Sequence, residues 1–470
     1  MQKMSKKYDI AIIGAGPGGY VAAVRAAQLG KRVVVMEKER VGGTCMNWGC
    51  IPTKYLLHQT KMYTQFMDNG NIDGIKDGLT CNWTKLQEAK MQVVMRLVKG
   101  IEFLLKQNGV DVVKGVARLK TEREVQVCDG GDDRIYEADK IILATGSVST
   151  DLPFLELNGK EVIDSQRSLD LEAIPQSMLI VGAGAIGLEM GTIFQRLGCQ
   201  VRVLEILPTI LPGSDRSMAK RLERILKLQG LDIQTQMRIE EAIITTGSVS
   251  LRGTCLKNDL PFKFNAEQVL LATGRSPNSN IFFDSDVPIG PEEAGFVRVN
   301  DHLETDVPGI YAIGDLIGGK LLAHKASHEG IVAAENAAGG DLKMGYEALP
   351  MSVFTEPEYA SVGLTESELR GKGEDAKIGQ FSLQANGRAL TLGDLEGVVK
   401  VVANSENRLV GAQIIAPNAS ELIAEMTLAV AKGLTLQDVS RTIHIHPTLS
   451  EAVMESAMHA LGGAIHVLNT

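Results

Sequence analysis

Two cysteines, Cys45 and Cys50, stand five positions apart in a stretch that also contains Gly49 and Pro52. Five residues of regular α-helix rise about 7.5 Å along the axis, whereas the Cα atoms of a disulfide usually lie within roughly 7 Å of each other. A bridge between these cysteines therefore requires a distorted helix, for which Gly49 and Pro52 provide the means. A pair that closes only with local strain is easily reduced, as catalytic pairs are. The other interpretations are two unrelated core thiols or half of a zinc site, although the spacing is not C-x2-C and no second Cys/His cluster follows in the sequence.

A second group of residues that could do chemistry lies near the C-terminus, where His446 is followed by Pro-Thr-Leu-Ser and then by Glu451. An imidazole backed by a carboxylate is a general base suited to neutral pH. Thr448 and Glu451 also have the spacing of a helix capping box, so capping would explain Glu451 and a loop before a helix-starting proline would explain His446. The spacing alone leaves both interpretations open.

The residues before the cysteines have the pattern of a dinucleotide-binding unit. A short apolar run leads into Gly-x-Gly-x-x-Gly at Gly14, Gly16 and Gly19, followed by a predicted helix over residues 20–29 and a strand that ends at Glu37. The first glycine permits a tight turn, the second lets backbone approach a pyrophosphate, and the third lets helix and strand pack closely. Because the carboxylate of Glu37 falls where it would bind a ribose diol, the pattern predicts a βαβ nucleotide site.

The same pattern recurs from Gly182, with a predicted helix over residues 188–197 and a strand that ends at Glu205. In both copies the acid follows the first glycine by 23 positions, and each copy is followed later by a strand that ends in Ala-Thr-Gly. This internal repeat predicts two nucleotide sites. The charge of Glu205 would repel a 2′-phosphate, so the second site should prefer NAD to NADP, with the side-chain direction of Arg202 as the open question.

A third segment has a predicted strand that ends in Gly314 and Asp315, and a predicted helix over residues 322–338 follows it. Asp315 is placed to bind a sugar hydroxyl, and the positive end of the helix could stabilise a developing anion. The alternative for Asp315 is a plain turn or N-cap residue. His324 and His328 would share one face of this helix, but without a third ligand we interpret them as surface or packing residues and not as metal ligands.

The rest of the chain predicts further elements. A helix is expected over residues 91–108, with an apolar face formed by Val94, Leu97, Ile101, Leu104 and Leu105. Residues 110–140 indicate short strands and turns that interrupt the first crossover. From about residue 349 the pattern changes to alternating strands followed by helices over 419–433 and 449–461, which indicates a separate α+β domain.

Length and composition limit the class of protein. The 470 residues suggest about three domains, and the hydrophobic fraction of 44% is typical of a protein with buried cores. The net charge of -9 argues against a nucleic-acid partner. No apolar run reaches membrane-spanning length and no signal or transit peptide is recognisable, so a cytoplasmic protein is expected. Six cysteines are too few for a disulfide scaffold, and we interpret four of them as ordinary thiols, namely Cys81, Cys128, Cys199 and Cys255.

Taken together, the motifs resemble the flavin-containing pyridine-nucleotide-disulfide oxidoreductases, in family order and over about residues 7–465. The resemblance rests on the cysteine stretch at 43–54, the two glycine fingerprints, Tyr-Ala-Ile-Gly-Asp at 311–315, Leu-Ala-His-Lys-Ala at 322–326, and residues 446–451. It implies an α/β fold with two Rossmann-like dinucleotide-binding domains and a C-terminal α+β dimerisation domain. The implied divisions are an FAD-binding domain at 1–150, an NAD-binding domain at 151–278, a central domain that completes the FAD site at 279–348, and a dimerisation domain at 349–470.

The resemblance also implies residue roles. Cys45 and Cys50 would form a redox-active disulfide, with Cys45 towards the substrate and Cys50 towards the flavin, and His446 held by Glu451 would be the base. A lysine near the flavin would pair with a glutamate of the second unit. The implied FAD-binding residues are Gly14, Gly16, Gly19, Glu37, Lys38, Gly43, Thr44, Lys54, Ala117, Thr145, Gly146, Asp315, Leu322, Ala323 and His324. The implied NAD-binding residues are Gly182, Gly184, Ile186, Gly187, Glu189, Glu205 and Gly274.

The implied activity is oxidation of protein-bound dihydrolipoamide to lipoamide with reduction of NAD. The implied partners are a second copy of the chain, which shares the active site, and the lipoyl domains of a 2-oxo-acid dehydrogenase complex or the lipoyl carrier of glycine cleavage, with no nucleic acid, membrane or metal. A glutathione-reductase-like enzyme would carry arginines for NADP near position 205, and a mercuric-reductase-like enzyme would end in adjacent cysteines, which this tail does not have. A transhydrogenase would lack the paired cysteines. A non-catalytic flavoprotein for assembly or redox sensing would not need the full set of chemical groups.

Overall fold

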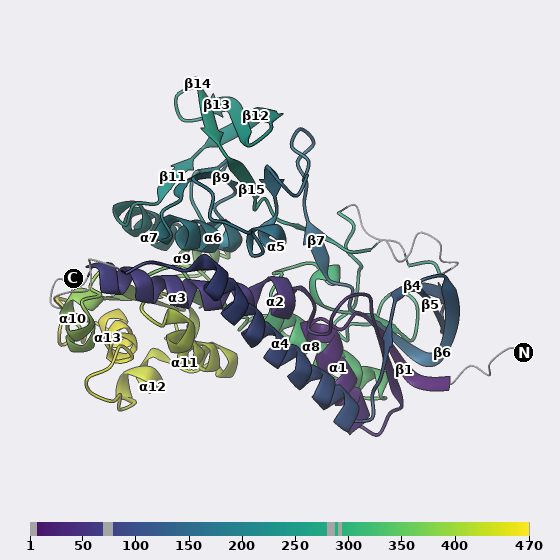
Figure 1. Cartoon of the computed structure of the whole chain (residues 1–470). Coiled ribbons are helices and arrows are strands. Elements are labelled where there is room, and N and C mark those ends of the chain that lie inside the picture. The colour runs from purple at the N-terminus through teal and green to yellow at the C-terminus, as the bar shows by residue number, and fades with distance from the viewer. Residues whose placement is uncertain (1–6, 69–78, 280–286, 290–293, 470) are drawn as a thin grey trace, which may run out of the picture.

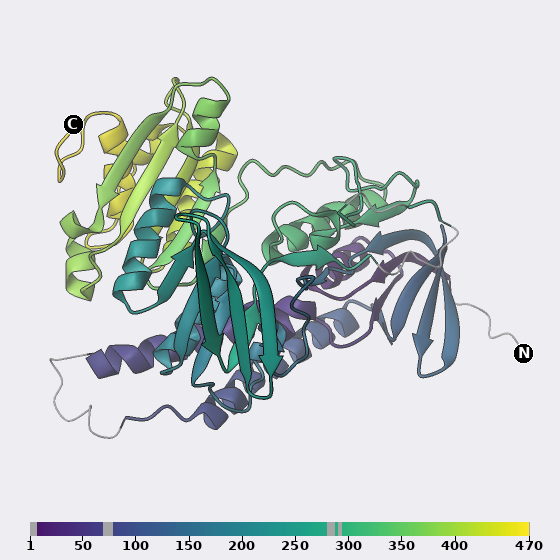
Figure 2. The same ribbon diagram turned by 90° about the horizontal axis from the view of Figure 1, so that it is seen from above.

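The computed structural model describes residues 7–68, 79–279, 287–289 and 294–469 of the chain. Figure 1 shows three lobes: one built mainly from the purple and blue N-terminal residues, a second from the teal residues, and a third from the yellow-green C-terminal residues. In Figures 1 and 2 the N-terminal and C-terminal lobes lie at opposite ends of the molecule. The predicted class, two nucleotide-binding units of α/β type followed by a C-terminal α+β domain, is confirmed.

The N-terminal lobe is built on a mainly parallel sheet. Its strands are β1 (Lys7–Ile13), β2 (Val33–Glu37), β3 (Asp111–Lys114), β4 (Val116–Thr121), β5 (Glu124–Asp129), β6 (Asp132–Leu143) and β17 (Ile310–Ala312). The order is β3-β2-β1-β6-β5-β4, and β17 pairs in parallel with the end of β6. The central strands are almost continuously apolar and buried, as expected of parallel strands covered on both faces. The segment 279–348 therefore adds a strand to the first sheet.

Helices α1 (Pro17–Gln28) and α8 (Ala323–Ala337) pack together in the core of this lobe. Their contact requires glycine, because a Cβ on Gly330 would lie 2.4 Å from the carbonyl oxygen of Gly18. α1 begins three residues before the predicted start, since a proline suits the first position of a helix. α8 lies where the sequence predicted a helix over 322–338.

The helix that carries the cysteines is interrupted between them. α2 (Gly43–Trp48) ends at Gly49, whose φ of -141° and ψ of -111° are not helical, and α3 (Cys50–Asp68) begins at the next residue. This break confirms the distortion that the spacing required. Gly49 alone provides it, because Pro52 lies in the first turn of α3, where the missing N–H would have had no helical partner.

Helix α4 (Trp83–Gln107) is eight residues longer at its start than the predicted helix. The side chain of Asn82 accepts a hydrogen bond from the N–H of Lys85 at 3.0 Å and caps the helix. The expected apolar face was also partly wrong, since Leu97 and Leu104 are 38% and 47% exposed. The buried positions along the middle and end of the helix are Val94, Val98, Ile101 and Leu105.

The second lobe repeats the architecture of the first. Its parallel sheet has the order β11-β10-β9-β15-β8 and consists of β8 (Val162–Ile163), β9 (Ser177–Val181), β10 (Gln200–Glu205), β11 (Asp232–Thr235) and β15 (Gln268–Leu271), with helices α5 (Ser165–Ser168), α6 (Ala185–Arg196) and α7 (Arg216–Leu228). An antiparallel sheet is formed by β12 (Met237–Thr245), β13 (Ser248–Cys255) and β14 (Leu260–Ala266). Like α1, α6 begins three residues before the predicted start. The lobe is joined to the first by a two-stranded sheet of β7 (Ser147–Ser149) and β16 (Arg275–Pro277).

The C-terminal lobe is an antiparallel sheet with helices, in the order β18-β19-β22-β21-β20. Its strands are β18 (Met351–Val353), β19 (Glu358–Gly363), β20 (Lys377–Ser382), β21 (Val398–Ala403) and β22 (Leu409–Ala416). Its helices are α9 (Glu366–Gly371), α10 (Gly387–Leu392), α11 (Ala419–Lys432), α12 (Leu436–Arg441) and α13 (Glu451–Ala460). Short 3-10 turns are η2 (Gly314–Ile317), which follows β17, and η3 (Leu383–Ala385).

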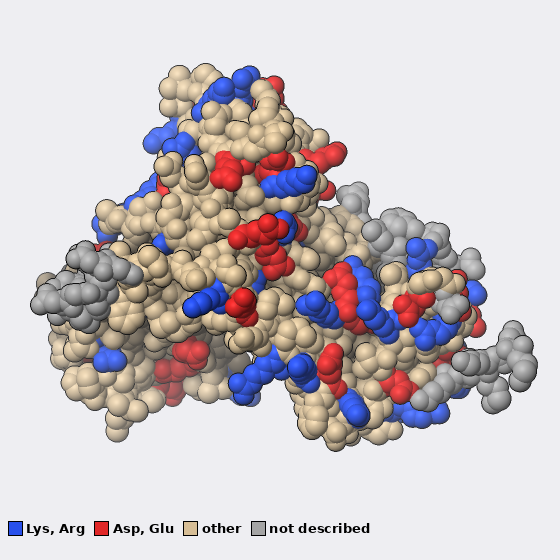
Figure 3. All heavy atoms as spheres, viewed as in Figure 1, with Lys and Arg blue, Asp and Glu red and all other residues tan. Residues whose placement is uncertain are grey.

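The outer surface carries charge of both signs. Figure 3 shows Lys and Arg interspersed with Asp and Glu on the visible face. Among the described helices, none combines the length and apolarity that a membrane span requires.

Candidate active site

Cys45 and Cys50 are free thiols in this structure, and their side chains are hydrogen-bonded to each other. The hydrogen bond from Cys45 lowers the pKa of Cys50 to about 7, with a further contribution from the charge of Lys54 and with burial acting in the opposite direction. The same hydrogen bond, together with burial, raises the pKa of Cys45. At neutral pH Cys45 therefore keeps its proton, whereas Cys50 is partly ionised to the thiolate. Cys50 is also the first residue of α3, where the helix dipole favours an anion.

This asymmetry predicts how the reduced pair reacts. Because only the thiolate attacks an alkylating agent, the alkylation rate of Cys50 should rise with a midpoint near pH 7, below the ordinary thiol value of about 8.5. Short pulses of iodoacetamide over a pH series, followed by peptide-level mass spectrometry, would measure it. Cys81 is the internal control, since burial raises its pKa. The same alkylation midpoint for Cys50 and Cys81 would contradict the lowered pKa of Cys50.

A partly buried ion pair lies beside the thiols, with the Lys54 side chain 31% exposed and that of Glu189 6% exposed. Lys54 Nζ donates to both carboxylate oxygens of Glu189, at 3.0 and 2.8 Å, so the contact that the family resemblance implied is present. Glu189 is 4% exposed and also accepts the N–H of Phe354 at 3.0 Å. Lys54 follows Cys50 by one helical turn, which places its charge on the same face of α3. The pair thus connects the cysteine helix with α6 of the second lobe and with Phe354, which directly follows β18, the first strand of the third lobe.

Both glycine fingerprints form the same tight turn. A Cβ on Gly14 would lie 2.4 Å from the carbonyl oxygen of Ala144, and a Cβ on Gly182 would lie 2.4 Å from the carbonyl oxygen of Ala272. Each first glycine therefore lets the fingerprint pass directly against the strand that ends in Ala-Thr-Gly. This explains why the two motifs occur together in each copy of the repeat.

The second glycine of each fingerprint leaves room for a ligand. Gly16 and Gly184 are the N-cap residues of α1 and α6, and neither has a side chain that could cap the helix. A Cβ on Gly16 would be 4.0 Å from the Cα of Gly43, and one on Gly184 would meet no described atom within 4 Å. Two helix N-termini with open backbone fit the pyrophosphate of a dinucleotide.

The acids of the repeat occupy equivalent places. Glu37 accepts the N–H groups of Ala15 at 2.8 Å and of Glu39 at 2.9 Å. Glu205 accepts the N–H groups at the equivalent positions, both at 2.8 Å. Each carboxylate is thereby held at its fingerprint with acceptor capacity left for ribose hydroxyls.

The side chain of Arg202 is held by Asp232 and Phe264 and not by the predicted ribose site. Its Nε contacts the carboxylate of Asp232 at 2.5 Å, and its guanidinium lies 4.0 Å from the centre of the Phe264 ring. A guanidinium that is both paired and stacked is not offered to a 2′-phosphate. The direction of the Arg202 side chain, which the sequence left open, is therefore towards Asp232 and Phe264.

Asp315 lies at the carboxyl end of β17, next to the ends of β1 and β6, where parallel sheets bind their ligands. Its carboxylate accepts a hydrogen bond from Ser147, and Arg275 donates to the hydroxyl and the carbonyl oxygen of Ser147, both at 2.7 Å. Ser147 and Arg275 were not among the site residues predicted from the sequence. Their position directly after the two Ala-Thr-Gly motifs was the available signal.

The other predicted nucleotide-binding residues lie in several elements, at helix starts, in loops and in β4. Lys38 follows β2, Gly43 and Thr44 open α2, and Ala117 is buried in β4. The hydroxyl of Thr145 donates to the carbonyl oxygen of Asn278 at 2.7 Å. Further members at element ends are Gly19, Gly146, Ile186, Gly187, Gly274, Leu322 and Ala323. His324 is exposed and donates from Nε2 to the carbonyl oxygen of Pro350 at 2.8 Å, and His328 is exposed as well, in agreement with a surface interpretation.

His446 and Glu451 form a hydrogen-bonded pair, with Nδ1 and Oε1 2.9 Å apart. Burial opposes ionisation of Glu451, but hydrogen bonds from the N–H of Thr448 and from His446 outweigh it and lower the pKa of Glu451. Because a carboxylate can only accept, Nδ1 of His446 carries the proton and Nε2 of the neutral ring is the basic nitrogen. The imidazole is 77% exposed.

The capping box proposed for this stretch is only half formed. Glu451 accepts the N–H of Thr448 at 2.9 Å, but the hydroxyl of Thr448 donates to the carbonyl oxygen of Ile445 at 2.7 Å. In addition, α13 begins at Glu451 and not at residue 449. Glu451 therefore both fixes the loop and holds the imidazole, and the two interpretations of the sequence are compatible.

Most of the chain matches known protein families. Residues 8–330 match the model of the pyridine nucleotide-disulphide oxidoreductases, and residues 349–457 match the dimerisation domain of the same proteins. The chain belongs to the pyridine nucleotide-disulphide oxidoreductase family. The family resemblance inferred from the sequence is confirmed, and the chain is an oxidoreductase.

Members of this family are similar to this chain over nearly its whole length. A dihydrolipoyl dehydrogenase from Thermus scotoductus is 42% identical over 469 residues, covering 99% of this chain and 100% of the relative. One from Geobacillus stearothermophilus is 41% identical over 459 residues, covering 97% of each. Among solved structures, LpdA from Mycobacterium tuberculosis has a TM-score of 0.87 at 25% identity, over 96% of this chain and 99% of that one. The HOCl-induced flavoprotein disulfide reductase RclA from Escherichia coli has a TM-score of 0.84 at 26% identity, over the same shares.

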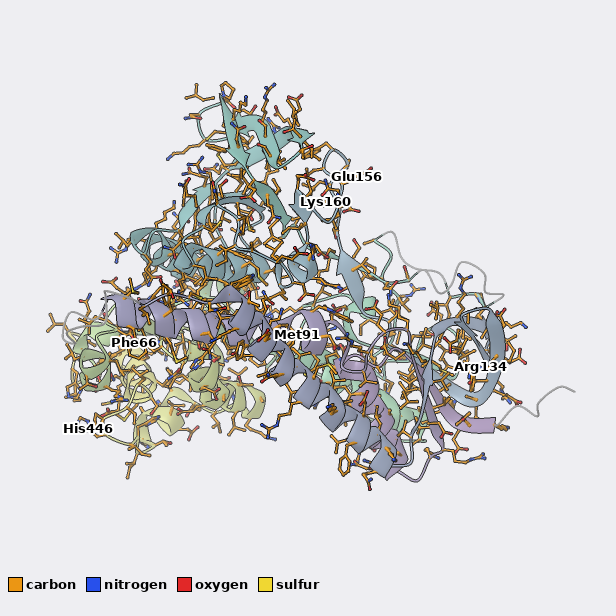
Figure 4. All side chains as sticks on the ribbon, viewed as in Figure 1. Phe66, Met91, Arg134, Glu156, Lys160 and His446 are labelled. Carbon is orange, nitrogen blue, oxygen red and sulfur yellow. The ribbon has the colours of Figure 1, made fainter. Side chains whose placement is uncertain are left out.

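Within one chain of this oxidoreductase, His446 and the two thiols are apart. Figure 4 places His446 at the outer edge of the C-terminal lobe, whereas Figure 1 shows α2, which carries Cys45, near the middle of the molecule. The structure thus brings Cys45, Cys50, Lys54 and Glu189 together and brings His446 and Glu451 together, as two separate groups.

Another imidazole–carboxylate pair was not predicted from the sequence. His466 Nδ1 lies 2.7 Å from Oε1 of Glu455, which is 3% exposed and follows Glu451 by one turn of α13. Glu455 also accepts the N–H of Ile465 at 3.1 Å. The spacing of the two acids on one helix was the available signal, but their partners lie in loops on either side of the helix.

Proposed function

We propose that the chain is a dihydrolipoyl dehydrogenase, which oxidises protein-bound dihydrolipoamide and reduces NAD. The observation that carries the proposal is the thiol pair itself, in which the pKa of Cys50 is lowered and that of Cys45 is raised, beside the Lys54–Glu189 ion pair. The chain also has two nucleotide cradles, by which we mean each glycine fingerprint together with its acid, Glu37 or Glu205. Relatives of that name that are 42% and 41% identical over nearly the whole chain support it.

The first cradle fits FAD and the second fits NAD. Gly14, Gly16 and Glu37 would hold the adenosine and pyrophosphate of FAD, and Asp315 would hold its ribityl chain. FAD, when bound, supplies a two-electron carrier between the thiol pair and the nicotinamide. The second fingerprint and Glu205 would hold NAD, since the two fingerprints have the same open helix N-terminus.

The thiol chemistry assigns one task to each group. Nε2 of His446 removes the proton from one substrate thiol, whose sulfur attacks Cys45 of the oxidised pair, and Cys50 leaves as a thiolate. The second substrate thiol then attacks the mixed disulfide, which closes the lipoamide S–S bond and releases Cys45. Two electrons pass to the cysteines, and the two protons reside on Cys45 and on His446. Glu451 stabilises the imidazolium that forms.

The site requires two chains in this proposal. Residues 349–457 match a dimerisation domain, and the base is remote from the thiols of its own chain in Figures 1 and 4. Large apolar side chains are exposed around the base and on the tail, at Ile443 (95%), Ile445 (77%), Ile465 (71%) and Leu468 (85%). Such a surface is typical of an interface, and a second copy of the chain would bring its His446 to these thiols. The lipoyl domain of a 2-oxo-acid dehydrogenase complex or of glycine cleavage would deliver the substrate.

The proposal predicts a preference for NADH over NADPH of at least about tenfold in kcat/KM, because Glu205 would face the 2′-phosphate at close range. Steady-state kinetics of lipoamide reduction with each nucleotide would measure the preference. In the Glu205→Gln variant the preference should shrink, while Glu37→Gln, at the equivalent place in the first cradle, should leave it unchanged. Equal efficiency of the two nucleotides with the native protein would contradict the role given to Glu205.

The direct test is production of NADH by the purified, FAD-loaded protein from dihydrolipoamide and NAD, followed by absorbance. We expect the protein to turn over a lipoylated protein domain. In the reverse direction, with NADH as the reductant, we expect no reduction of oxidised glutathione. A protein that reduces glutathione but not lipoamide would refute the proposal.

A further inference from the structure

The turn that presents Asp315 is held by a buried ionic network. The N–H of Gly314 donates to Oε2 of Glu329 at 2.7 Å, and Lys325 Nζ donates to the carbonyl oxygen of Gly314 at 3.2 Å. Lys325 and Glu329 form an ion pair at 2.9 Å with side chains 3% and 0% exposed. The hydroxyl of Tyr346 donates to Oε1 of Glu329 at 2.7 Å. Both polar groups of a single peptide residue are thus bound by charged side chains of α8.

This turn cannot be held by the sheet. Gly314 has a φ of 74°, in the left-handed region, and it is the first residue of η2, just after the end of β17. Since its backbone leaves the strand there, its polar groups need partners elsewhere, and the buried pair provides them. A buried ion pair is favourable only when its remaining hydrogen-bonding capacity is used, and here Gly314 and Tyr346 use it.

We propose that Lys325, Glu329 and Tyr346 are positioning residues that fix the Gly314–Asp315 turn against the flavin. The inference rests on the proposed function, in which Asp315 holds the ribityl chain of FAD. Ser147 orients the carboxylate of Asp315 from one side, and the network fixes the backbone from the other. None of the three side chains is assigned any contact with the flavin itself.

The chain offers a matched control. Lys400 on β21 is also a buried lysine with a 3% exposed side chain, and its Nζ pairs with Asp215 at 2.9 Å and with Glu366 at 3.1 Å. It lies in the C-terminal lobe and ties that lobe to the start of α7. Lys325→Met and Lys400→Met therefore remove the same charge from equally buried lysines, one at the Asp315 turn and one away from it.

The experiment measures the rate of FAD release from the holoenzyme after dilution, by the rise in free-flavin fluorescence. Lys325→Met should release FAD about ten- to a hundredfold faster than the native protein, as expected for loss of hydrogen bonds to charged groups. Lys400→Met should release it at the native rate, although thermal unfolding should show both variants to be destabilised. Equal release rates for the two variants would overturn the inference.

A milder variant decides the matter if Lys325→Met does not fold. Tyr346→Phe removes one hydroxyl from a side chain that is 42% exposed, and it should accelerate FAD release about two- to tenfold. A native release rate in this variant would overturn the inference while leaving the proposed function intact. A native protein that binds no FAD would instead overturn the proposed function together with the inference.

Discussion

Replacing Cys50 by serine should lower dihydrolipoamide oxidation by at least about a thousandfold, as expected when the nucleophilic unit of an enzyme is removed. A serine oxygen cannot form the sulfur–sulfur bond that accepts the electron pair. Nor would an alcohol ionise near neutral pH, as Cys50 does with its pKa of about 7. NADH formation by the FAD-loaded variant would measure the loss.

The matched control for this substitution is Cys81→Ser. Cys50 and Cys81 are both partly buried thiols, but burial raises the pKa of Cys81, and it lies outside the pair. Cys81→Ser should keep native turnover, and Cys50→Ser should keep its FAD, since no flavin-binding role is given to the thiol. Normal turnover in Cys50→Ser would refute the thiol relay, whereas loss of FAD from it would mean that the substitution had damaged the fold.

Local patterns in the sequence were sufficient to predict the local structure of the two nucleotide cradles. A fingerprint, its helix and its acid lie within one βαβ unit, so their spacing nearly determines their contacts. The equal hydrogen bonds of Glu37 and Glu205 to their fingerprints show this. The break at Gly49 was predictable for the same reason, because it follows from helix geometry over five residues.

Contacts between distant segments could not be predicted in this way. The pair of Lys325 and Glu329 reads as an ordinary i, i+4 pair on a helix, and only the approach of Gly314 from the end of β17 makes it a buried network. Leu97 and Leu104 fit an apolar stripe, yet the register of α4 against its neighbours leaves them exposed. The starts of α4 and α1 were misplaced because the cap Asn82 and the proline in the first turn, and not periodicity, decided these boundaries.

Replacing His446 by glutamine should lower turnover by at least about a hundredfold, the range expected for loss of a general base. Glutamine keeps an N–H that can donate to Glu451, so the loop can remain in place while the basic nitrogen is lost. His459→Gln is the control, because His459 lies on α13, the helix that begins at Glu451, and accepts the N–H of Gln380 in β20 at 3.3 Å. A loss of less than about threefold in His446→Gln would mean that the histidine is only structural.

The same variant can show whether one site is built from two chains. If His446 serves the thiols of a second copy, a hybrid of the Cys50→Ser and His446→Gln chains has one site in which both groups are native. Random pairing of the two inactive chains makes half of the dimers hybrids, so co-expression should restore about a quarter of native activity, as two-fold symmetry requires. If the base served its own chain, every site would lack one group and no activity would return. We expect activity to be recovered because His446 and the cysteines lie apart within one chain (Figures 1 and 4).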